Sequence, residues 1–291
     1  LPSVGAGNVL RDIIASGCVP TVRLTDIYRQ DEHSMIVLNA HRINNGQMPV
    51  LDNKSTDFFF ESRATQEDAA ASVLALCTRR LPAYFGVDPV RDVQVLCPQK
   101  KGGCGVIQMN RLLQQALNPP ERLKPELKQG DNILRLGDKV MQTRNNYTVK
   151  WRRALPNGAL EDGEGVFNGD IGYIIEVLKG EAAVLFEDGK EARYDSASLE
   201  DLMPAYAISV HKSQGCEFKI VVMPLVSGPP MLYVRNLLYT GVTRAKNAVV
   251  LVGKRETIAN MINNNVISAR YSNLSGLIEK AVSEQKTEEI S

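Results

Sequence analysis

The sequence has little of what marks a secreted, metal-binding or membrane-spanning protein. Its 291 residues include five cysteines, an odd number without Cys-x-x-Cys spacing, and three dispersed histidines. This pattern argues against a disulfide framework and against a metal site. No apolar run approaches the roughly 18 residues that a membrane-spanning helix needs. We therefore expect a cytoplasmic protein with reduced thiols and no membrane contact.

Aromatic residues and net charge are also scarce. Aromatic side chains make up 6% of the chain, with a single tryptophan, and the formal net charge is +1. A charge this small does not by itself indicate nucleic acid as a partner. The hydrophobic content of 44% is nevertheless enough to form real cores. The length predicts roughly two domains.

The sequence motifs with which nucleotide hydrolases bind phosphate and Mg²⁺ are missing as well. Gly-Lys occurs only at Gly189-Lys190 and Gly253-Lys254, and neither pair is followed by Ser or Thr. The only Asp-Glu pair, Asp31-Glu32, follows Tyr28-Arg29-Gln30 rather than an apolar strand. The sequence therefore contains neither a Walker A loop nor a Walker B strand.

What is present is an alternation of strands and helices. Strands are predicted at 58–60, 93–97, 219–225 and 248–253, and helices within 25–46 and at 65–81, 106–117 and 273–282. Thr65 is the expected cap of the second helix, and Pro82 is expected just beyond its end. Such alternation predicts a parallel α/β sheet.

The spacing of apolar residues along the sequence changes between Arg135 and Ala207. Apolar runs become short there and are separated by turn signals such as Asn157-Gly158 and Asp188-Gly189. Strands are predicted at 172–178, 182–186 and 192–194, and 150–165 is expected to be an exposed loop. This segment predicts a small β-barrel inserted into the α/β domain.

Two segments near the C-terminal end carry the polar side chains of greatest chemical interest. Ser209–Phe218 reads Ser-Val-His-Lys-Ser-Gln-Gly-Cys-Glu-Phe, and Leu238–Lys246 reads Leu-Tyr-Thr-Gly-Val-Thr-Arg-Ala-Lys. Each lies beside a strand of the predicted sheet, whose strand ends can form a ligand-binding edge. The second places Arg244 at a helix end, where an arginine can stabilise charge on a transferring phosphoryl group or simply complement the helix dipole.

These segments resemble motifs V and VI of superfamily-1 helicases. Their amino-acid sequences are most similar to those of the RecD-like branch. Further matches cover about residues 1–254: Leu1–Gly7 resembles the tail of motif III, Ile27–Gln30 resembles motif IV, and Val95–Gly102 also fits. Gly137–Gln142 and Val166–Gly172 look like the entry to the Src-homology-3-like barrel of that family.

The resemblance implies a division of the chain. Residues 1–24 would be the remnant of a first motor domain, 25–145 with 204–260 a second RecA-like motor domain, 146–203 the inserted barrel and 261–291 a C-terminal tail. The Gly-Asp and Gln that open motif III are missing. We expect the chain to be the second half of a motor, without the half that grips ATP.

The resemblance also implies roles for residues near the nucleotide. Arg29 and Arg244 would act on the γ-phosphate of ATP, and Gln214, Gly215 and Glu217 would couple the nucleotide to the DNA track. From the residues alone, a surface ion pair is the favoured interpretation of Arg29, and Gln214 and Glu217 could be simple loop hydrogen-bonders.

A second group of residues is predicted to contact single-stranded DNA. His211, Lys212 and Ser213 offer donors for phosphate oxygens, although a lone histidine is more often structural. Lys100 and Lys101 are either a solvated turn or part of a helix N-terminus that holds a phosphate. From Lys139 to Arg153 five cations occur without an acid, with Arg144, Asn145 and Trp151 as the candidate contacts. The alternative is a solvated loop face.

The expected function is that of the C-terminal motor half of an ATP-dependent 5′–3′ DNA helicase. The intact enzyme would hold ATP and Mg²⁺ between this half and the N-terminal motor domain of the same protein, and the chain alone would be inactive. Two alternatives stay open: the helicase part of a conjugative relaxase, and a nucleic-acid-binding module without catalysis.

Overall fold

A five-stranded parallel sheet forms the centre of the α/β part of the molecule. The computed structural model describes residues 8–22, 34–265 and 272–288. The strand order is β1-β14-β13-β2-β12. The bounds are β1 Phe58–Ser62, β2 Val93–Cys97, β12 Ala207–Ser209, β13 Phe218–Leu225 and β14 Ala245–Gly253. The three central strands, β14, β13 and β2, are almost continuously buried, as expected for a parallel sheet that is covered on both faces.

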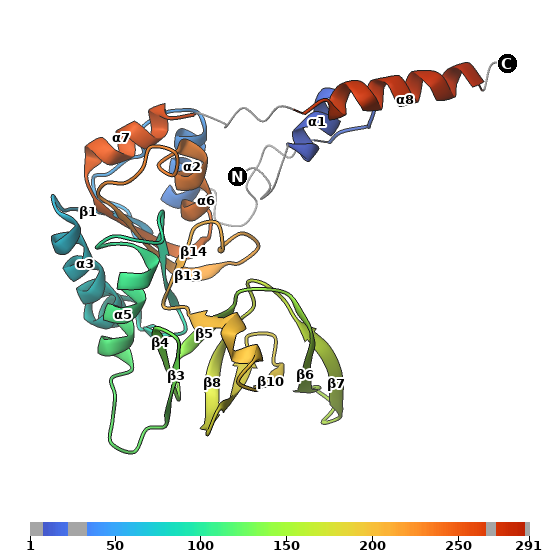
Figure 1. The fold of residues 1–291 in the computed structure, drawn as a ribbon. Helices are drawn as coiled ribbons and strands as arrows, with labels where there is room; N and C mark the ends of the chain where they lie inside the picture. Colours follow the sequence, from blue (N-terminus) through green and yellow to red (C-terminus); the bar gives the residue numbers. More distant parts are fainter. Residues whose placement is uncertain (1–7, 23–33, 266–271, 289–291) are drawn as a thin grey trace.

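Helices cover both faces of this sheet (Figure 1). One face packs against α2 Met35–Asn44, α6 Arg235–Val242 and α7 Arg255–Asn263, and the other against α3 Gln66–Ala75, η1 Leu76–Arg80, α4 Leu81–Phe85 and α5 Val106–Leu117. The predicted parallel α/β fold is therefore confirmed, and α5 has the predicted bounds. Helix α2 begins at Ser34, whose hydroxyl accepts a hydrogen bond from the Ile36 amide at 3.2 Å. The first part of the predicted 25–46 helix lies outside the described residues.

The helix predicted at 65–81 starts as expected but continues past Pro82. Thr65 caps α3 by accepting from the Asp68 amide at 3.1 Å. The chain then widens into a π-turn at η1, where the Leu81 amide donates to the Leu76 carbonyl, and Pro82 sits in the first turn of α4. The expected stop at Pro82 was wrong because the wider turn accommodates a residue that lacks an amide hydrogen.

A seven-stranded antiparallel sheet forms the barrel part, with the order β11-β5-β8-β9-β10-β6-β7. Its strands are β5 Lys139–Gln142, β6 Asn146–Ala154, β7 Leu160–Val166, β8 Ile171–Leu178, β9 Glu181–Phe186, β10 Glu191–Tyr194 and β11 Leu202–Pro204. A short hairpin, β3 Glu126–Gln129 with β4 Asn132–Arg135, and the 3₁₀ turn η2 Ser198–Asp201 complete it. The predicted β-rich insertion is confirmed, and its strands extend from 139 to 204.

The segment expected to be an exposed loop at 150–165 is instead the hairpin of β6 and β7. Arg152 pairs with Asp162, and Trp151 lies opposite Gly163 in the register of this hairpin. The half-buried indole covers Gly163 so closely that an added Cβ would lie 2.3 Å from the ring. Glycine at this position is therefore part of the packing of Trp151.

A buried carboxylate joins the barrel to the α/β part. Asp138, fully buried just before β5, accepts hydrogen bonds from Gln114 at 2.6 Å, Asn118 at 2.6 Å and Tyr206 at 2.8 Å. The Arg135 amide adds a fourth bond at 2.7 Å. Burial raises the pKa of Asp138, and these donors act in the opposite direction. The carboxylate thereby ties helix α5 to the chain entering and leaving the barrel.

The outer edge of the parallel sheet, strand β1, is closed by side chains of the preceding loop. Asn53 donates to the Phe60 carbonyl at 2.9 Å and accepts from the Phe60 amide at 2.7 Å. Ser55 does the same for Phe58, at 2.8 and 3.0 Å. Edge strands usually leave such groups open to pairing with another chain. At these two residues the groups are already satisfied.

Two helices lie outside the two sheet-based parts. Helices α1 Val9–Ala15 and α8 Leu274–Glu288 contact each other (Figure 1). Neither these nor the other described helices are long and apolar enough to cross a membrane.

Candidate nucleotide and nucleic-acid interface

The two segments singled out in the sequence meet at the amino ends of β13 and β14. Glu217 directly precedes β13, and Arg244 directly precedes β14. The Phe218 amide donates to the Arg244 carbonyl at 2.9 Å, and the Arg244 Nη1 donates to the Cys216 carbonyl at 3.1 Å. Glu217 and Lys246 form an ion pair at 2.8 Å. The structure thus brings the predicted Arg244, Gly215 and Glu217 into one region.

The guanidinium of Arg244 is partly buried and held in place. Its Nε donates to the Thr240 carbonyl at 3.3 Å, in the last turn of α6. Arg244 therefore does complement a helix end, as one reading of the sequence expected. Its contact with the Cys216 carbonyl adds a second role, because it fixes the position of the charge relative to the 210–217 loop.

The 210–217 loop places its predicted residues differently from one another. Gln214 and Gly215 are exposed, and Gly215 has φ +88° with open space around it. Ser213 is fully buried, and its hydroxyl donates to the Val210 carbonyl at 2.7 Å. The side-chain hydroxyl of Ser213 is thus occupied inside the protein, and its contact with a DNA backbone stays a prediction.

Lys212 links this loop to the barrel. Its Nζ donates to the Thr143 carbonyl at 3.0 Å and to the side-chain oxygen of Asn168. Burial lowers the pKa of Lys212. The neighbouring His211 is exposed, and its pKa is also lowered, chiefly by burial of part of the ring. Of the three predicted phosphate contacts, His211 is exposed, Lys212 is half-buried and Ser213 is buried.

A cleft of about 350 Å³ separates the loop from the barrel. Its lining includes the acids Asp170, Glu187, Asp188 and Glu217. Four carboxylates repel a phosphate, so this cleft is unsuited to nucleotide or DNA backbone. It also holds no metal set: no cluster of three or more His, Cys, Asp or Glu side chains suitable for a metal occurs among the described residues.

The cations between Lys139 and Arg153 do not form one basic groove. Arg144 pairs with Asp201 at 3.2 Å, Arg152 with Asp162 at 2.7 Å and Arg153 with Glu161 at 2.5 Å. Lys139 is fully buried and cannot reach a ligand at the surface. The acids absent from the local sequence are supplied by neighbouring strands and turns. The predicted track is therefore largely neutralised within the protein.

Two other predicted contacts in this stretch are also engaged within the protein. Asn145 accepts from the Asn168 amide at 2.9 Å and donates to the Tyr147 hydroxyl at 3.3 Å. The ring of Trp151 lies 5.1 Å from Lys190 Nζ and 5.7 Å from the Arg153 guanidinium. Its face is thus shared with cations of the barrel rather than left open for a base.

Lys100 and Lys101 lie away from Arg244. They follow the carboxyl end of β2, whereas Arg244 precedes the amino end of β14, which runs parallel to it in the same sheet. Both lysines are exposed. The amides of Gly103, Gly105, Val106 and Ile107 already donate to protein oxygens. A phosphate held by these four amides is thereby excluded, and the solvated-turn reading fits the loop better.

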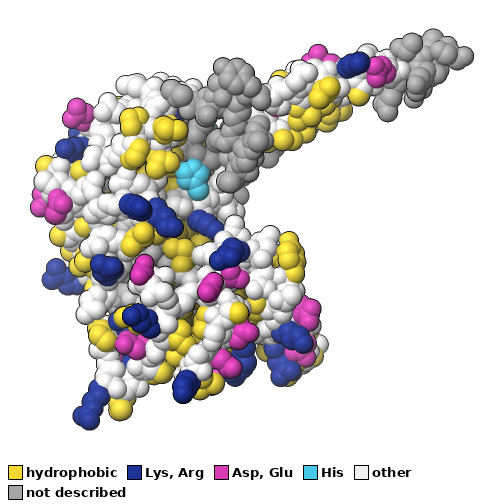
Figure 2. All heavy atoms as spheres, in the orientation of Figure 1, with side chains coloured by type: hydrophobic (Ala, Val, Ile, Leu, Met, Phe, Trp, Pro, Cys, Tyr) yellow, Lys and Arg dark blue, Asp and Glu magenta, His cyan; other side chains and the backbone are white. Residues whose placement is uncertain are grey.

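Cationic side chains nevertheless gather on one face. Figure 2 shows Lys and Arg side chains in a band over the region of β13 and β14, close to the start of the barrel.

The other predicted arginine, Arg29, lies outside the described residues, as does the motif III-like segment Leu1–Gly7. Sequence reasoning missed Lys246 and Asn168, which hold Glu217 and Lys212 in place. Both are ordinary surface residue types, so only three-dimensional pairing identifies them.

Comparisons with known families agree with this architecture. Residues 109–187 match the SH3 domain of ATP-dependent RecD-like DNA helicases, and residues 204–252 match the UvrD-like helicase C-terminal domain. The first covers α5 and most of the barrel, and the second covers the strands on either side of Arg244.

Individual relatives cover more of the chain. The ATP-dependent RecD2 DNA helicase of Deinococcus radiodurans is 30% identical over 253 residues, which is 87% of this chain and 31% of that protein. The RecBCD enzyme subunit RecD of Mycolicibacterium smegmatis is 28% identical over 176 residues, or 60% of this chain and 28% of that protein. A Bacteroides Pif1 helicase in complex with ADP-AlF3 and ssDNA aligns with a TM-score of 0.44 and 15% identity, over 91% of this chain and 57% of that one. The chain spans about a third or less of the curated relatives named here, and its two matched segments are similar to the SH3 domain of RecD-like DNA helicases and to the C-terminal domain of UvrD-like helicases.

Proposed function

We propose that this chain is the C-terminal motor part of an ATP-dependent 5′–3′ DNA helicase. In this proposal Arg244, together with Arg29, acts on the γ-phosphate of ATP held against the N-terminal motor domain of the same protein. The 210–217 loop transmits the state of the nucleotide to single-stranded DNA. The similar RecD2 protein of Deinococcus radiodurans is an ATP-dependent DNA helicase. The polarity and the two-sided nucleotide site are what the resemblance of the motif V-like and motif VI-like segments to superfamily-1 helicases implies.

The observation that carries the proposal is the bond from Arg244 to the Cys216 carbonyl. It joins the phosphate-directed arginine to the loop that contains Gln214, Gly215 and Glu217. A shift of the Arg244 guanidinium toward a phosphate would lengthen this hydrogen bond, and the 210–217 loop would change position as a result. Movement of the loop would conversely reposition the guanidinium. A single contact of this kind can couple hydrolysis to movement of the DNA.

When bound, Mg²⁺ would neutralise phosphate charge, and its ligands would come from outside the described residues. The chain's own contribution is the fixed cation. A pre-positioned arginine stabilises charge that develops on the transferred phosphoryl group, without reorganisation at the moment of reaction.

The first prediction concerns Arg244 in the full-length protein. Arg244→Ala should lower ATP turnover by about 10³–10⁵-fold, the contribution of an arginine acting on a phosphoryl group. A helix-end cation contributes only about 0.3–1 kcal/mol to stability, so fold and DNA affinity should change little. Steady-state hydrolysis and DNA-binding anisotropy measure the two effects. Near-normal turnover would make Arg244 purely structural and would remove the basis of the proposal.

The matched control is Lys246→Ala. Lys246 forms the ion pair with Glu217, which is a second contact between the Leu238–Lys246 segment and the 210–217 loop. It removes a cation of the same region without removing the predicted phosphate contact. We expect at most a modest fall in turnover for this variant.

A further inference from the structure

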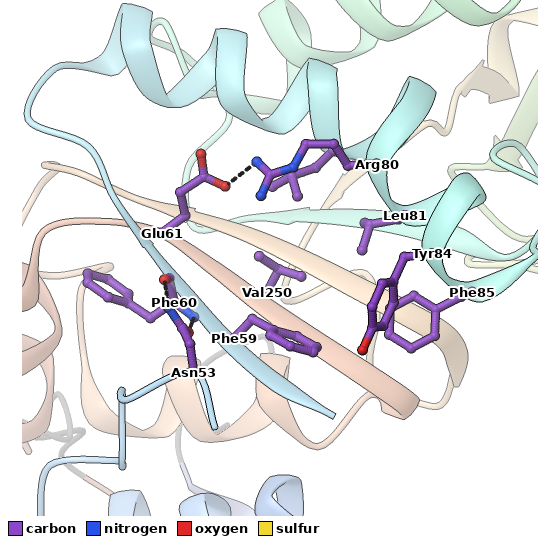
Figure 3. A pocket seen from close by; sticks show the side chains of 10 residues that line it. Asn53, Phe59, Phe60, Glu61, Arg80, Leu81, Tyr84, Phe85 and Val250 are labelled. Carbon is purple, nitrogen blue, oxygen red and sulfur yellow. Dashed lines mark hydrogen bonds and ion pairs between the residues drawn. The ribbon is translucent and has the colours of Figure 1, made fainter. Parts of the chain in front are cut away.

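An apolar pocket lies at the β1 edge of the parallel sheet, and none of its lining residues belongs to the 210–217 loop or to the Leu238–Lys246 segment. It has a volume of about 380 Å³ and lies between β1 and the helical stretch from η1 to α4 (Figure 3). Its lining is formed by Asn53, Phe59, Phe60, Glu61, Leu76, Arg80, Leu81, Tyr84, Phe85 and Val250. Pockets that bind ligands commonly have volumes of about 300–1,000 Å³ and apolar linings with a few polar groups.

Aromatic rings form one wall of this pocket, and one of them faces solvent. Phe59, Tyr84 and Phe85 pack edge-to-face, with centroid distances of 6.4 Å from Phe59 to Tyr84 and 4.7 Å from Tyr84 to Phe85. Tyr84 is 68% exposed, although Phe59 and Phe85 pack against its ring. Exposed aromatic anchors beside an apolar pocket are typical of binding surfaces.

The π-turn shapes the pocket. Leu76 and Arg80, the first and last residues of η1, both line it. A π-turn within a helix costs hydrogen-bond geometry and is found frequently at functional sites. In this chain it brings an apolar side chain and a cationic side chain to the same opening.

A cluster of three charged side chains with one net positive charge lies at the pocket: Glu61 and Arg80 belong to its lining, and Arg63 pairs with Glu61 from outside the lining. The Glu61 carboxylate is bound by Arg80 at 2.7 Å and by Arg63, so two cations surround one acid. The Arg80 side chain is 58% exposed and available to a further partner. Such a rim attracts an acidic segment, since electrostatic complementarity guides association.

The sealed edge of β1 determines how a partner can bind. Because Asn53 and Ser55 occupy the outward amide and carbonyl groups of Phe60 and Phe58, a peptide cannot extend the sheet there. A partner must instead insert a side chain. We propose that this pocket is a docking site for an acidic peptide segment of a partner protein, which inserts one large apolar or aromatic side chain into the pocket beside Phe59 and Tyr84.

Nucleic acid is a less suitable occupant of this pocket. A base could stack on Tyr84, but Arg80 is the one cation among the described lining residues, so a phosphate backbone would find a single charged partner there. The lining of the pocket also includes no residue of the 210–217 loop, which leads from β12 into β13.

The test is selection from a library of random displayed peptides on the 291-residue chain. We expect enrichment of peptides that combine Asp or Glu with Trp, Phe or Leu. The best peptide, labelled with fluorescein, is then titrated by anisotropy. Tyr84→Ala and Arg80→Ala should each weaken binding by about tenfold or more, as expected for aromatic and arginine anchors.

Two matched variants control for exposure and charge. Tyr147 is 67% exposed on the barrel, and Arg193 has a 61% exposed side chain paired with Glu176, so each resembles its counterpart in the pocket. Tyr147→Ala and Arg193→Ala should leave peptide binding unchanged. The proposal is overturned if no acidic apolar peptide is enriched, or if pocket and control variants weaken binding equally. It is also overturned if Tyr84→Ala weakens binding of an oligothymidylate instead.

Discussion

The amine of Lys139 is buried in the contact between barrel and α/β part. Its side chain is fully buried, and its Nζ has no hydrogen-bond partner in the described part of the chain. The nearest defined contact is the ring of Phe218, whose centroid lies 5.8 Å away. Burial lowers the pKa of Lys139 to about 8, while the carboxylates of Glu187, Asp88 and Asp92 oppose this shift.

Lys139→Met should therefore stabilise the chain near neutral pH. Burying the charged amine costs roughly 3 kcal/mol at pH 7 relative to its unfolded state, part of which the Phe218 contact offsets. Because the folded pKa lies below the unfolded one, the wild type gains stability as pH rises from about 8 toward 10.5. The variant should be more stable at pH 7, and the difference should shrink toward pH 10. Thermal or denaturant unfolding across this range measures it, and an equal difference at every pH would contradict the prediction.

Arg144 also has a role that depends on its partner. It is 68% exposed and pairs with Asp201, so it must leave this acid before it can bind a phosphate. Asp201→Asn should therefore strengthen binding to single-stranded DNA, and Arg144→Ala should weaken it. Each phosphate neutralised contributes about −0.7 to the slope of log affinity against log salt. Anisotropy over a salt series tests both variants, and unchanged slopes would assign Arg144 to the solvated surface of the barrel.

At the scale of elements, the 210–217 loop is held from two sides. Arg244 holds it to the α/β part through the Cys216 carbonyl, and Lys212 holds it to the barrel through Thr143 and Asn168. The loop is therefore a bridge between the two parts rather than a free DNA-binding arm.

Lys212→Met should release the barrel side of this bridge. A hydrogen bond from a charged donor contributes about 1.5–3 kcal/mol, so amide hydrogen exchange in 210–217 should accelerate by roughly tenfold or more. The strands β5 and β13 should keep their protection. Lys219→Met, which removes an exposed pair with Asp92, is the control and should leave the loop unchanged. Unaltered exchange in the loop would mean that the contact carries no stability.

The same scale shows what local sequence could predict. Helix α5 was predicted residue for residue because its apolar positions repeat with helical period and Gly105 and Asn118 flank it. The hairpin of β6 and β7 was missed because both strands are mostly exposed, so no apolar alternation marks them. Its signal lies in the opposite charges that the register brings together, such as Arg152 and Asp162. The neutralised basic stretch was missed for the same reason, since its acids come from other segments.

For the whole molecule, the sequence predicts that the chain alone has no meaningful ATPase activity. It supplies an arginine but has no Walker A or Walker B motif, so the reacting groups cannot be positioned. A coupled assay of the purified chain with ATP, Mg²⁺ and single-stranded DNA tests this, with the full-length protein as positive control. Robust turnover that co-purifies with the chain would contradict the two-part motor.

The clamp around Asp138 also bears on how this architecture can change during evolution. The seven-stranded sheet starts along the chain at Lys139 and ends at Pro204, and the Ala205 amide donates to the Lys139 carbonyl at 2.8 Å. Tyr206 on the returning chain binds the same carboxylate as Gln114 and Asn118. The segment that enters the seven-stranded sheet and the segment that leaves it are thus hydrogen-bonded to each other where they join the α/β part. Together they form a two-stranded stem. An insert attached through such a stem can be shortened, enlarged or exchanged while the parallel sheet keeps its strand order. The barrel is in this sense a replaceable module, with Asp138 as the fastening that any replacement would have to keep.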